Sequence, residues 1–303
     1  MKIIYRFSIV SSFLGLWITT LFPEDFELIL GFFLIFTFGM IHGSNDILII
    51  NSFTNESNFS FGKILITYLL VVVSAVLIFY WFPGLALILF IVFSAYHFGE
   101  QHWQEDLKLV HTNYKRIYFF IYGLFILFIV FYFNDGNVKM IINEIAGFKL
   151  RDLYSKEISI ALGASIVVFL LLTLRQNKIE LNTIIKELFT LIILMVIFKS
   201  SSLIWGFTIY FIIWHSIPSL LEQIKFAYGD LKRVHIMEYT KAALPYWIVS
   251  LAGMSLLYLV LKGEKHFYSL FFAFIAAVTF PHAIVMLKMF SKKIIKLAKT
   301  KKA

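Results

Sequence analysis

The sequence predicts an all-α protein, a polytopic transmembrane helix bundle of about ten spans, and three observations favour this class. Hydrophobic residues make up 60% of the 303 residues and charged residues only 15%, whereas a soluble domain is nearer half apolar and a quarter charged. The mean hydropathy is +0.84. Apolar runs of about 20 residues, the length that crosses a bilayer, recur from one end of the chain to the other.

The expected spans follow one another with short connections. Their ranges are 5–22, 27–50, 63–82, 84–103, 115–133, 157–174, 186–199, 202–222, 243–262 and 267–287. The seventh is the shortest, and the segment 137–150 is a candidate interfacial piece. The first has basic residues before it, as a signal peptide does, but it lacks a small-residue cleavage site, so we expect a retained helix. We expect one transmembrane domain over 1–287 and a basic cytoplasmic tail over 288–303.

The placement of lysine and arginine predicts the orientation. With both termini in the cytoplasm, most basic residues outside the spans lie on that side, whereas the first outer loop carries Glu24, Asp25 and Glu27 and no base. The net charge of +9 then follows from topology and indicates membrane lipid as a partner, with no nucleic acid. Abundant Ile, Lys, Phe and Asn are typical of an AT-rich bacterial genome, so we expect a multi-pass protein of a bacterial inner membrane. Cysteine is absent, which excludes disulfides and thiolate metal sites.

Four histidines lie inside predicted spans, each in a short polar motif. They are His42 in Gly39–Asp46, His97 in Tyr96–Glu100, His215 in Trp214–Pro218, and His282 after Phe280 and Pro281. Ionisable residues within a span are rare and usually mark a functional site. All four spans run in the same direction, and each histidine lies about 20 Å into its span. We therefore predict a ring of four imidazoles in the cytoplasmic half of the bilayer.

A hydrogen bond between helices would satisfy one such histidine, but four at one depth favour a shared metal or cofactor. We predict His42, His97, His215 and His282 as metal ligands. Imidazole suits Fe, Zn, Cu or Ni. Four neutral ligands leave the full +2 charge on the ion and can leave positions open on an octahedral metal, which suits dioxygen chemistry on Fe(II).

Three acidic residues follow these histidines along the chain. Asp46 comes four residues after His42, Glu100 three after His97, and Glu222 seven after His215. These spacings place each acid on the helix face of its histidine, where it can accept the second N–H of a metal-bound imidazole. For Glu222, an interfacial charge is an equal alternative.

Small residues, prolines and aromatics surround the same motifs. Gly39, Gly43 and Gly99 leave space for a substrate or a neighbouring helix, and prolines next to two of the histidines interrupt the helical hydrogen bonds, as happens where backbone lines a cavity. Nearby aromatics are candidates to line a tunnel for a lipophilic substrate, although packing is the commoner role. The tunnel candidates are Tyr96, Phe98 and Trp214, with Phe93, Trp103, Trp205, Tyr210, Phe211, Phe271, Phe272 and Phe274 around them.

Four further histidines have ordinary explanations. His102 is expected at the membrane interface, and His111, His235 and His266 in solvated loops.

The motifs resemble those of the Brp/Blh family of bacterial membrane β-carotene dioxygenases. The resemblance rests on His-Gly-x-x-Asp at His42–Asp46, Tyr-His-Phe-Gly at Tyr96–Gly99, Trp-His-Ser-x-Pro at Trp214–Pro218 and Pro-His at Pro281–His282. It covers nearly the whole chain. It implies an Fe(II) enzyme that splits β-carotene at its central double bond with O2, giving two molecules of retinal for a microbial rhodopsin.

One position departs from the family pattern. The third motif often has a second histidine four residues after the first, counted among the iron ligands, and this chain has Ser219 there. Either His282 takes its place or the iron site is altered. A serine hydroxyl cannot replace an imidazole as a strong neutral ligand to Fe(II), so we predict His282 as the fourth ligand.

Three other functions compete with this one. Di-iron hydroxylases and desaturases need about eight histidines in clustered His-x-x-His or His-x-x-x-His motifs, and neither spacing occurs here. A haem-binding electron carrier would use histidine pairs as axial ligands. A carotenoid or retinal carrier, or an assembly factor for an opsin, would bind without cleaving.

Overall fold

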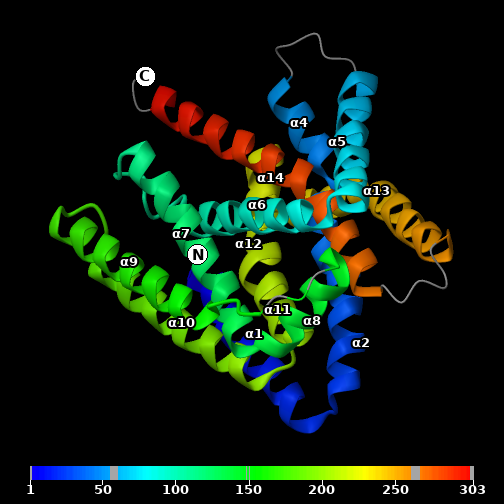
Figure 1. Ribbon diagram of the computed structural model, residues 1–303. Helices are drawn as coiled ribbons and strands as arrows, with labels where there is room; N and C mark the ends of the chain where they lie inside the picture. The colour runs from blue at the N-terminus through cyan, green and yellow to red at the C-terminus, as the bar shows by residue number, and fades with distance from the viewer. Residues whose placement is uncertain (1, 55–60, 148, 150, 261–266, 301–303) are drawn as a thin grey trace. The chain divides into compact units, whose positions relative to one another are not determined.

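The computed structural model (Figure 1) describes residues 2–54, 61–147, 149, 151–260 and 267–300, and every regular element within these ranges is a helix. Nine of the described helices are long and apolar enough to cross a membrane. They are Ile3–Leu21, Glu24–Ser52, Phe61–Trp81, Pro83–Trp103, Thr112–Phe133, Ser155–Arg175, Leu181–Ser200, Leu203–Tyr228 and Phe274–Lys293. Their length and composition confirm the predicted all-α polytopic bundle.

Two predicted spans differ in extent from the helices that contain them. The seventh was predicted over 186–199, whereas α10 (Leu181–Ser200) begins at Leu181 and has 20 residues. It includes Glu187, a buried carboxylate with protein partners. The span predicted at 243–262 falls in α13 (Arg233–Val260), which is not among the nine helices found long and apolar enough to cross a membrane within the described residues. Its last two residues lie outside the described ones. The candidate interfacial piece falls on the short helix α8 (Asp135–Ala146).

Two compact units make up the chain. The first contains residues 1–37, 94–143 and 149–218, and the second contains 38–93, 144–148 and 219–303. Helix α6 (Pro83–Trp103) contributes residues to both.

The first unit packs its helices around an aromatic core. Its elements are α1 (Lys2–Leu21), α2 (Glu24–Leu34), the end of α6, α7 (Thr112–Phe133), α8, α9 (Ser155–Arg175), α10, α11 (Leu203–Ile209) and the π-helix η2 (Tyr210–Ser216). Helix α9 packs along α7, α11 on α2, and α1 on both α10 and η2 (Figure 1). Tyr118, Phe119 and Tyr122 of α7 are almost fully buried in this core.

Helices α6 and α7 approach unusually closely within the first unit. A Cβ atom on Gly99 would lie 1.8 Å from the carbonyl oxygen of Phe119, and a Cβ on Gly123 would lie 1.8 Å from that of Ala95. Any side chain at either glycine would therefore collide with backbone, which cannot yield as a flexible side chain can. The space predicted beside Gly99 is filled by a neighbouring helix, one of the two alternatives.

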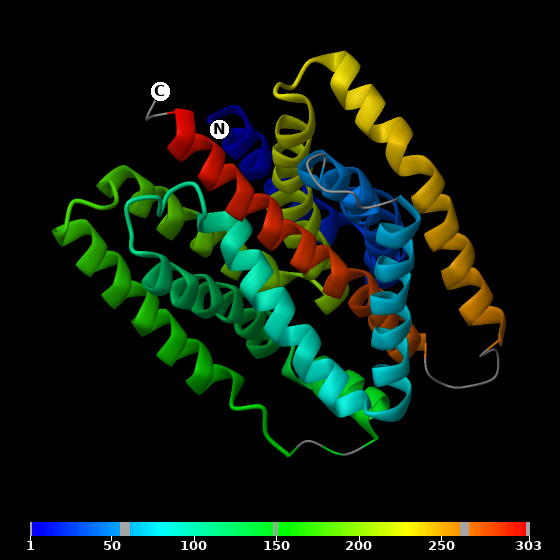
Figure 2. The ribbon, with the colours of Figure 1, turned by 90° about the horizontal axis from the view of Figure 1, so that it is seen from above.

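The second unit is organised around α14 (Phe267–Thr300). The other helices are α3 (Met40–Ser44), α4 (Asp46–Thr54), α5 (Phe61–Trp81), α12 (Ile217–Tyr228) and α13. Helix α14 packs along α5 and also contacts α4 and α3, while α13 packs on α3 (Figure 2). The buried cluster here consists of Ile49, Ile224, Tyr239, Val285, Met286, Met289 and Phe290. The domain boundary predicted at residue 287 lies within α14.

Candidate metal centre

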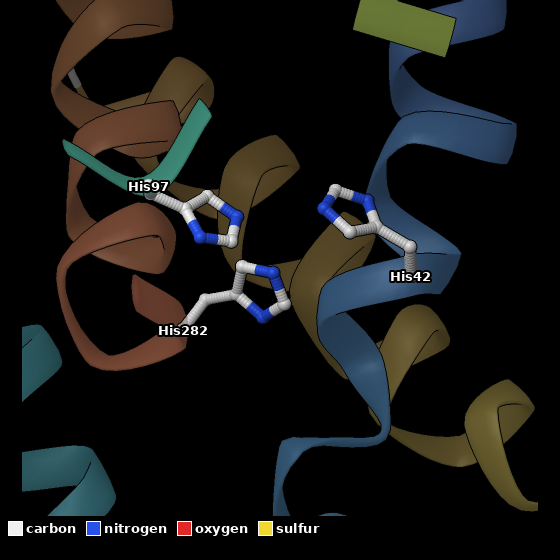
Figure 3. A group of neighbouring side chains, drawn as sticks. All are labelled: His42, His97 and His282. Carbon is white, nitrogen blue, oxygen red and sulfur yellow. The ribbon is translucent and has the colours of Figure 1, made fainter. Parts of the chain in front are cut away.

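Two of the four motif histidines, His42 and His282, meet inside the second unit. Their ring centroids are 4.7 Å apart with the planes nearly perpendicular, and each offers a ring nitrogen within 4.8 Å of the other's. Both side chains are buried, and Figure 3 shows the two rings turned toward each other from different helices. Figure 3 also labels His97, which is described with the first unit.

Hydrogen bonds orient both of these imidazoles through the same nitrogen. His42 Nδ1 donates to the carbonyl oxygen of Gly39, and His282 Nδ1 donates to Asp46 Oδ1 at 2.8 Å. Because a carbonyl or carboxylate oxygen can only accept, the proton of each neutral ring lies on Nδ1 and the lone pair on Nε2. This is the tautomer in which a histidine binds a metal through Nε2 while its other nitrogen is held by an acceptor.

Asp46 accepts hydrogen bonds through both of its carboxylate oxygens, one of them from His282. It is 1% exposed, and its second oxygen, Oδ2, accepts from the hydroxyl of Tyr68 at 3.0 Å. From the helical spacing, Asp46 was predicted to accept a hydrogen bond from His42. In the structure it accepts one from His282 instead. The helix breaks between His42 and Asp46, since Asn45 at the end of α3 has φ −95° and ψ 16°, so the i, i+4 relation does not hold.

Ser219, the position where the family pattern has a further histidine, is also buried in the second unit. Its Oγ accepts from Gln223 Nε2 at 3.2 Å, and Gln223 Oε1 accepts from the hydroxyl of Tyr239. The side chain of Asn45 in turn donates to the carbonyl oxygen of Tyr239 at 2.7 Å. The serine hydroxyl thus belongs to a polar chain that ties α12, α13 and α3 together.

The other two motif histidines, His97 and His215, meet inside the first unit. Their ring centroids are also 4.7 Å apart, at an interplanar angle of 84°, and both side chains are buried. Phe98 lies edge-on to His215 at 4.7 Å, and Phe211 stacks on it at 5.6 Å. His97 and His215 therefore sit in a closely packed aromatic environment.

Two π-helices accompany the histidine motifs. The first, η1 (Ile35–Gly39), ends just before α3, which carries His42, and its last residue supplies the carbonyl that holds that imidazole. The second, η2, contains His215 itself. Short π segments inside α-helices occur frequently at functional sites, and hydrophobic periodicity did not predict either of them.

The acids predicted beside the first-unit histidines have other surroundings. Glu100 is buried, and Tyr96, Lys115 and Arg116 lie close enough to interact with its carboxyl group. Two cations of α7 therefore offset part of the cost of burying this carboxyl group. Glu222 lies in α12 and is half-buried.

The three predicted tunnel residues differ in their contacts. Trp214 Nε1 donates to Ser12 Oγ at 2.9 Å, which fixes the indole against α1. Tyr96 packs edge-on against Phe119 at 6.2 Å. Phe98 contacts the aromatic rings of His215 and Tyr210, so it is the one of these three for which a contact with a predicted ligand is described.

The remaining histidines have local partners. His111 caps α7, accepting from the backbone N–H of Asn113. His235 lies near the start of α13 and pairs with Asp230 at 2.6 Å, a carboxyl whose pKa is lowered to about 2, chiefly by hydrogen bonds from Lys232. His266 lies outside the described residues. His102, predicted at the interface, is bonded to Glu187.

The fold defines the class as an all-α polytopic membrane protein, and its two close pairs of buried imidazoles have donor chemistry that suits a metal ion. Over residues 33–290 the chain matches the family model described as Beta-carotene 15,15'-dioxygenase, and it belongs to that family. Its members are carotene-cleaving dioxygenases, so the resemblance seen in the motifs is confirmed. The searches for similar curated proteins and similar solved structures found no match.

Proposed function

We propose that this protein binds one Fe(II) through His42, His97, His215 and His282 and splits β-carotene at its central double bond with O2. The products are two molecules of retinal, each carrying one oxygen atom from the O2. The observation that carries this proposal is the occurrence of two close pairs of buried imidazoles in a chain of this dioxygenase family.

The donor set suits the metal. Four neutral imidazoles with no thiolate are compatible with Fe(II) and leave its full positive charge available. Bound there, the iron would supply the activation of O2 that a direct reaction with the polyene lacks. The hydrogen-bonded Nδ1 atoms of His42 and His282 support Nε2 as their metal-binding atom.

The protein's own residues orient these ligands. Asp46, held by Tyr68, fixes the ring of His282 and would offset part of the charge of the metal. The backbone oxygen of Gly39 does the same for His42 without adding charge. Phe98 and Phe211 pack on the imidazole of His215 and exclude water around it.

The substrate would enter from the membrane itself. β-Carotene is apolar throughout, so it partitions into the hydrocarbon layer that surrounds the apolar helices. Retinal would leave through the same layer, where a rhodopsin in the same cell would take it up.

We also propose the bacterial inner membrane as the location of the protein, with both termini in the cytoplasm. This orientation follows from the lysine and arginine asymmetry. C-terminal reporter fusions that are active only outside the cytoplasm would contradict this orientation.

The direct test is expression of the chain in a bacterium that makes β-carotene. We expect loss of the orange colour and the appearance of retinal, and about one iron per purified chain. His235→Ala is a suitable control, because His235 is bonded to Asp230 outside the candidate spans and should keep both properties. A wild-type protein that binds carotenoid or retinal but forms no product would instead be a carrier or an opsin assembly factor.

A further inference from the structure

A second buried polar cluster lies in the first unit, apart from the four motif histidines. Glu187 of α10 accepts two hydrogen bonds, from His102 Nε2 to Oε2 at 2.7 Å and from the hydroxyl of Tyr122 to Oε1 at 2.5 Å. The imidazole of His102 also stacks on the ring of Tyr122, with centroids 4.9 Å apart and planes within 19°. We call His102, Tyr122 and Glu187 the carboxylate clamp.

The clamp joins three helices. His102 belongs to α6, Tyr122 to α7 and Glu187 to α10, and both Tyr122 and Glu187 are buried. A carboxylate inside an apolar span is costly unless its hydrogen bonds are satisfied. Both of its oxygens are bonded here, so the three side chains hold one another in a fixed arrangement and thereby fix the three helices.

The position of the clamp on α6 relates it to His97. His102 follows His97 by five residues, which is a rotation of about 140° at 3.6 residues per turn. His102 therefore projects from nearly the opposite side of the helix, about 7.5 Å further along its axis. The hydrogen bond from His102 to Glu187 therefore holds α6 on the side opposite His97. It limits the rotation of the helix about its own axis.

The glycine contacts control the distance between the same two helices. His97 lies midway between Ala95 and Gly99, the two residues whose backbones touch Gly123 and Phe119 of α7. Such close contact between small residues leaves little freedom for one helix to slide or tilt against the other. Ala95, Gly99 and His102 share one face of α6, opposite the face of His97. The backbone contacts and the hydrogen bonds therefore act together on that face and define the direction in which His97 projects.

We propose that His102, Tyr122 and Glu187 are positioning residues that hold the imidazole of His97 in its metal-binding orientation. This inference rests on the proposed iron site, because it assigns the clamp a task that exists only if His97 is a ligand. The clamp touches neither metal nor substrate. It acts through the rotation of α6.

The test compares Glu187→Leu with Glu187→Gln in the purified full-length protein, using Co(II) as the probe. Glutamine keeps an oxygen for Tyr122, and its N–H₂ group can donate to Nε2 of His102 once that neutral imidazole carries its proton on Nδ1. Leucine has a similar size and no hydrogen-bonding group. We expect Glu187→Leu to weaken Co(II) binding about 10- to 100-fold, the range seen when groups supporting metal ligands are removed, and to change the visible d–d absorption of the bound ion. Glu187→Gln should restore the wild-type spectrum and an affinity within about threefold.

A matched control separates positioning from general loosening of the bundle. The side chain of Asn134 at the end of α7 donates to the carbonyl oxygen of Phe198 in α10 at 3.3 Å, so it joins two of the same helices away from the clamp. Asn134→Leu should lower the unfolding temperature without changing the Co(II) spectrum. If Asn134→Leu changes the spectrum as much as Glu187→Leu does, the clamp has no specific role and the inference is wrong.

A milder variant covers the case in which Glu187→Leu fails to accumulate. Tyr122→Phe removes one hydrogen bond and keeps the ring that stacks on His102, and we expect a loss of Co(II) affinity of about threefold to tenfold. A folded Glu187→Leu or Tyr122→Phe protein with wild-type affinity and spectrum would overturn the inference. Wild-type protein that binds no Co(II) and no iron would instead contradict the proposed function.

Discussion

The two histidine pairs have the same distance between ring centroids, 4.7 Å, but different neighbours. In the second unit, a carbonyl and a carboxylate accept from the Nδ1 atoms of His42 and His282. In the first unit, aromatic rings pack against His215. A hydrogen bond fixes both the ring orientation and the tautomer, while packing fixes the ring plane alone. Among the side chains that contact a motif histidine directly, those of the second unit should therefore alter metal affinity most when they are substituted.

The largest effect should come from the ligands themselves, and it should be equal in the two units. We expect His42→Ala and His97→Ala each to abolish iron binding and retinal formation, because each removes one donor of a single centre. Iron content and retinal are measured on the same membranes, with His235→Ala as the control. Full iron retention in both variants would show that the two pairs do not share a metal.

The second-largest effect concerns the fourth ligand, for which His282 and Ser219 are the two candidates in the second unit. We expect His282→Ala to lose iron and turnover, and Ser219→Ala to keep both, since the hydroxyl of Ser219 is bonded to Gln223. Iron content and retinal yield are measured for both variants after normal membrane insertion has been checked, and they show which residue is the ligand. The reverse result, with iron lost only in Ser219→Ala, would remove His282 from the proposed ligand set.

Substitution of Asp46 should sharpen the comparison. Asp46→Asn keeps the shape of the side chain and removes the charge that faces His282, so we expect iron affinity to fall about 10- to 100-fold. Tyr68→Phe removes one hydrogen bond to Asp46 and should cost less. Iron titration of the purified variants gives both values. If Asp46→Asn binds iron as tightly as the wild type does, the hydrogen bond at 2.8 Å is structural only.

The smallest effect is expected in the aromatic surroundings of the first unit. Phe98→Leu should lower stability by about 1 kcal/mol, the value of a ring–ring contact beyond its buried area, and should keep iron affinity within about threefold of the wild type. Thermal unfolding and iron titration measure the two quantities. A loss of iron affinity as large as that of Asp46→Asn would mean that packing orients His215 as strictly as hydrogen bonds orient His282.

Much of this protein could be predicted from its sequence because apolar length and histidine position are local properties. The helical class and the four motif histidines required only the distance across a bilayer and the rarity of imidazole within it. The partner of Asp46 could not be predicted, because the break at Asn45 redirects the acid toward a histidine 236 residues away in the chain. The start of α10 at Leu181 was missed for a related reason. The charged residues Lys186 and Glu187 favour a span that begins there, until the buried partners of Glu187 are known. The ring of four at one depth and the tunnel stay predictions.

The π-helix around His215 has a consequence for how this chain tolerates insertions and deletions. A π segment accommodates one residue more than an α-helix of the same rise, and each residue of an α-helix turns the chain by about 100°. Loss of a single residue within η2 would let the segment relax to a regular α-helix. The residues after it would keep their faces, while residues within it, among them His215, would be turned by up to about 100°. In this segment the number of residues should therefore be more strictly limited than their identity, and a one-residue deletion should be more damaging than most apolar substitutions.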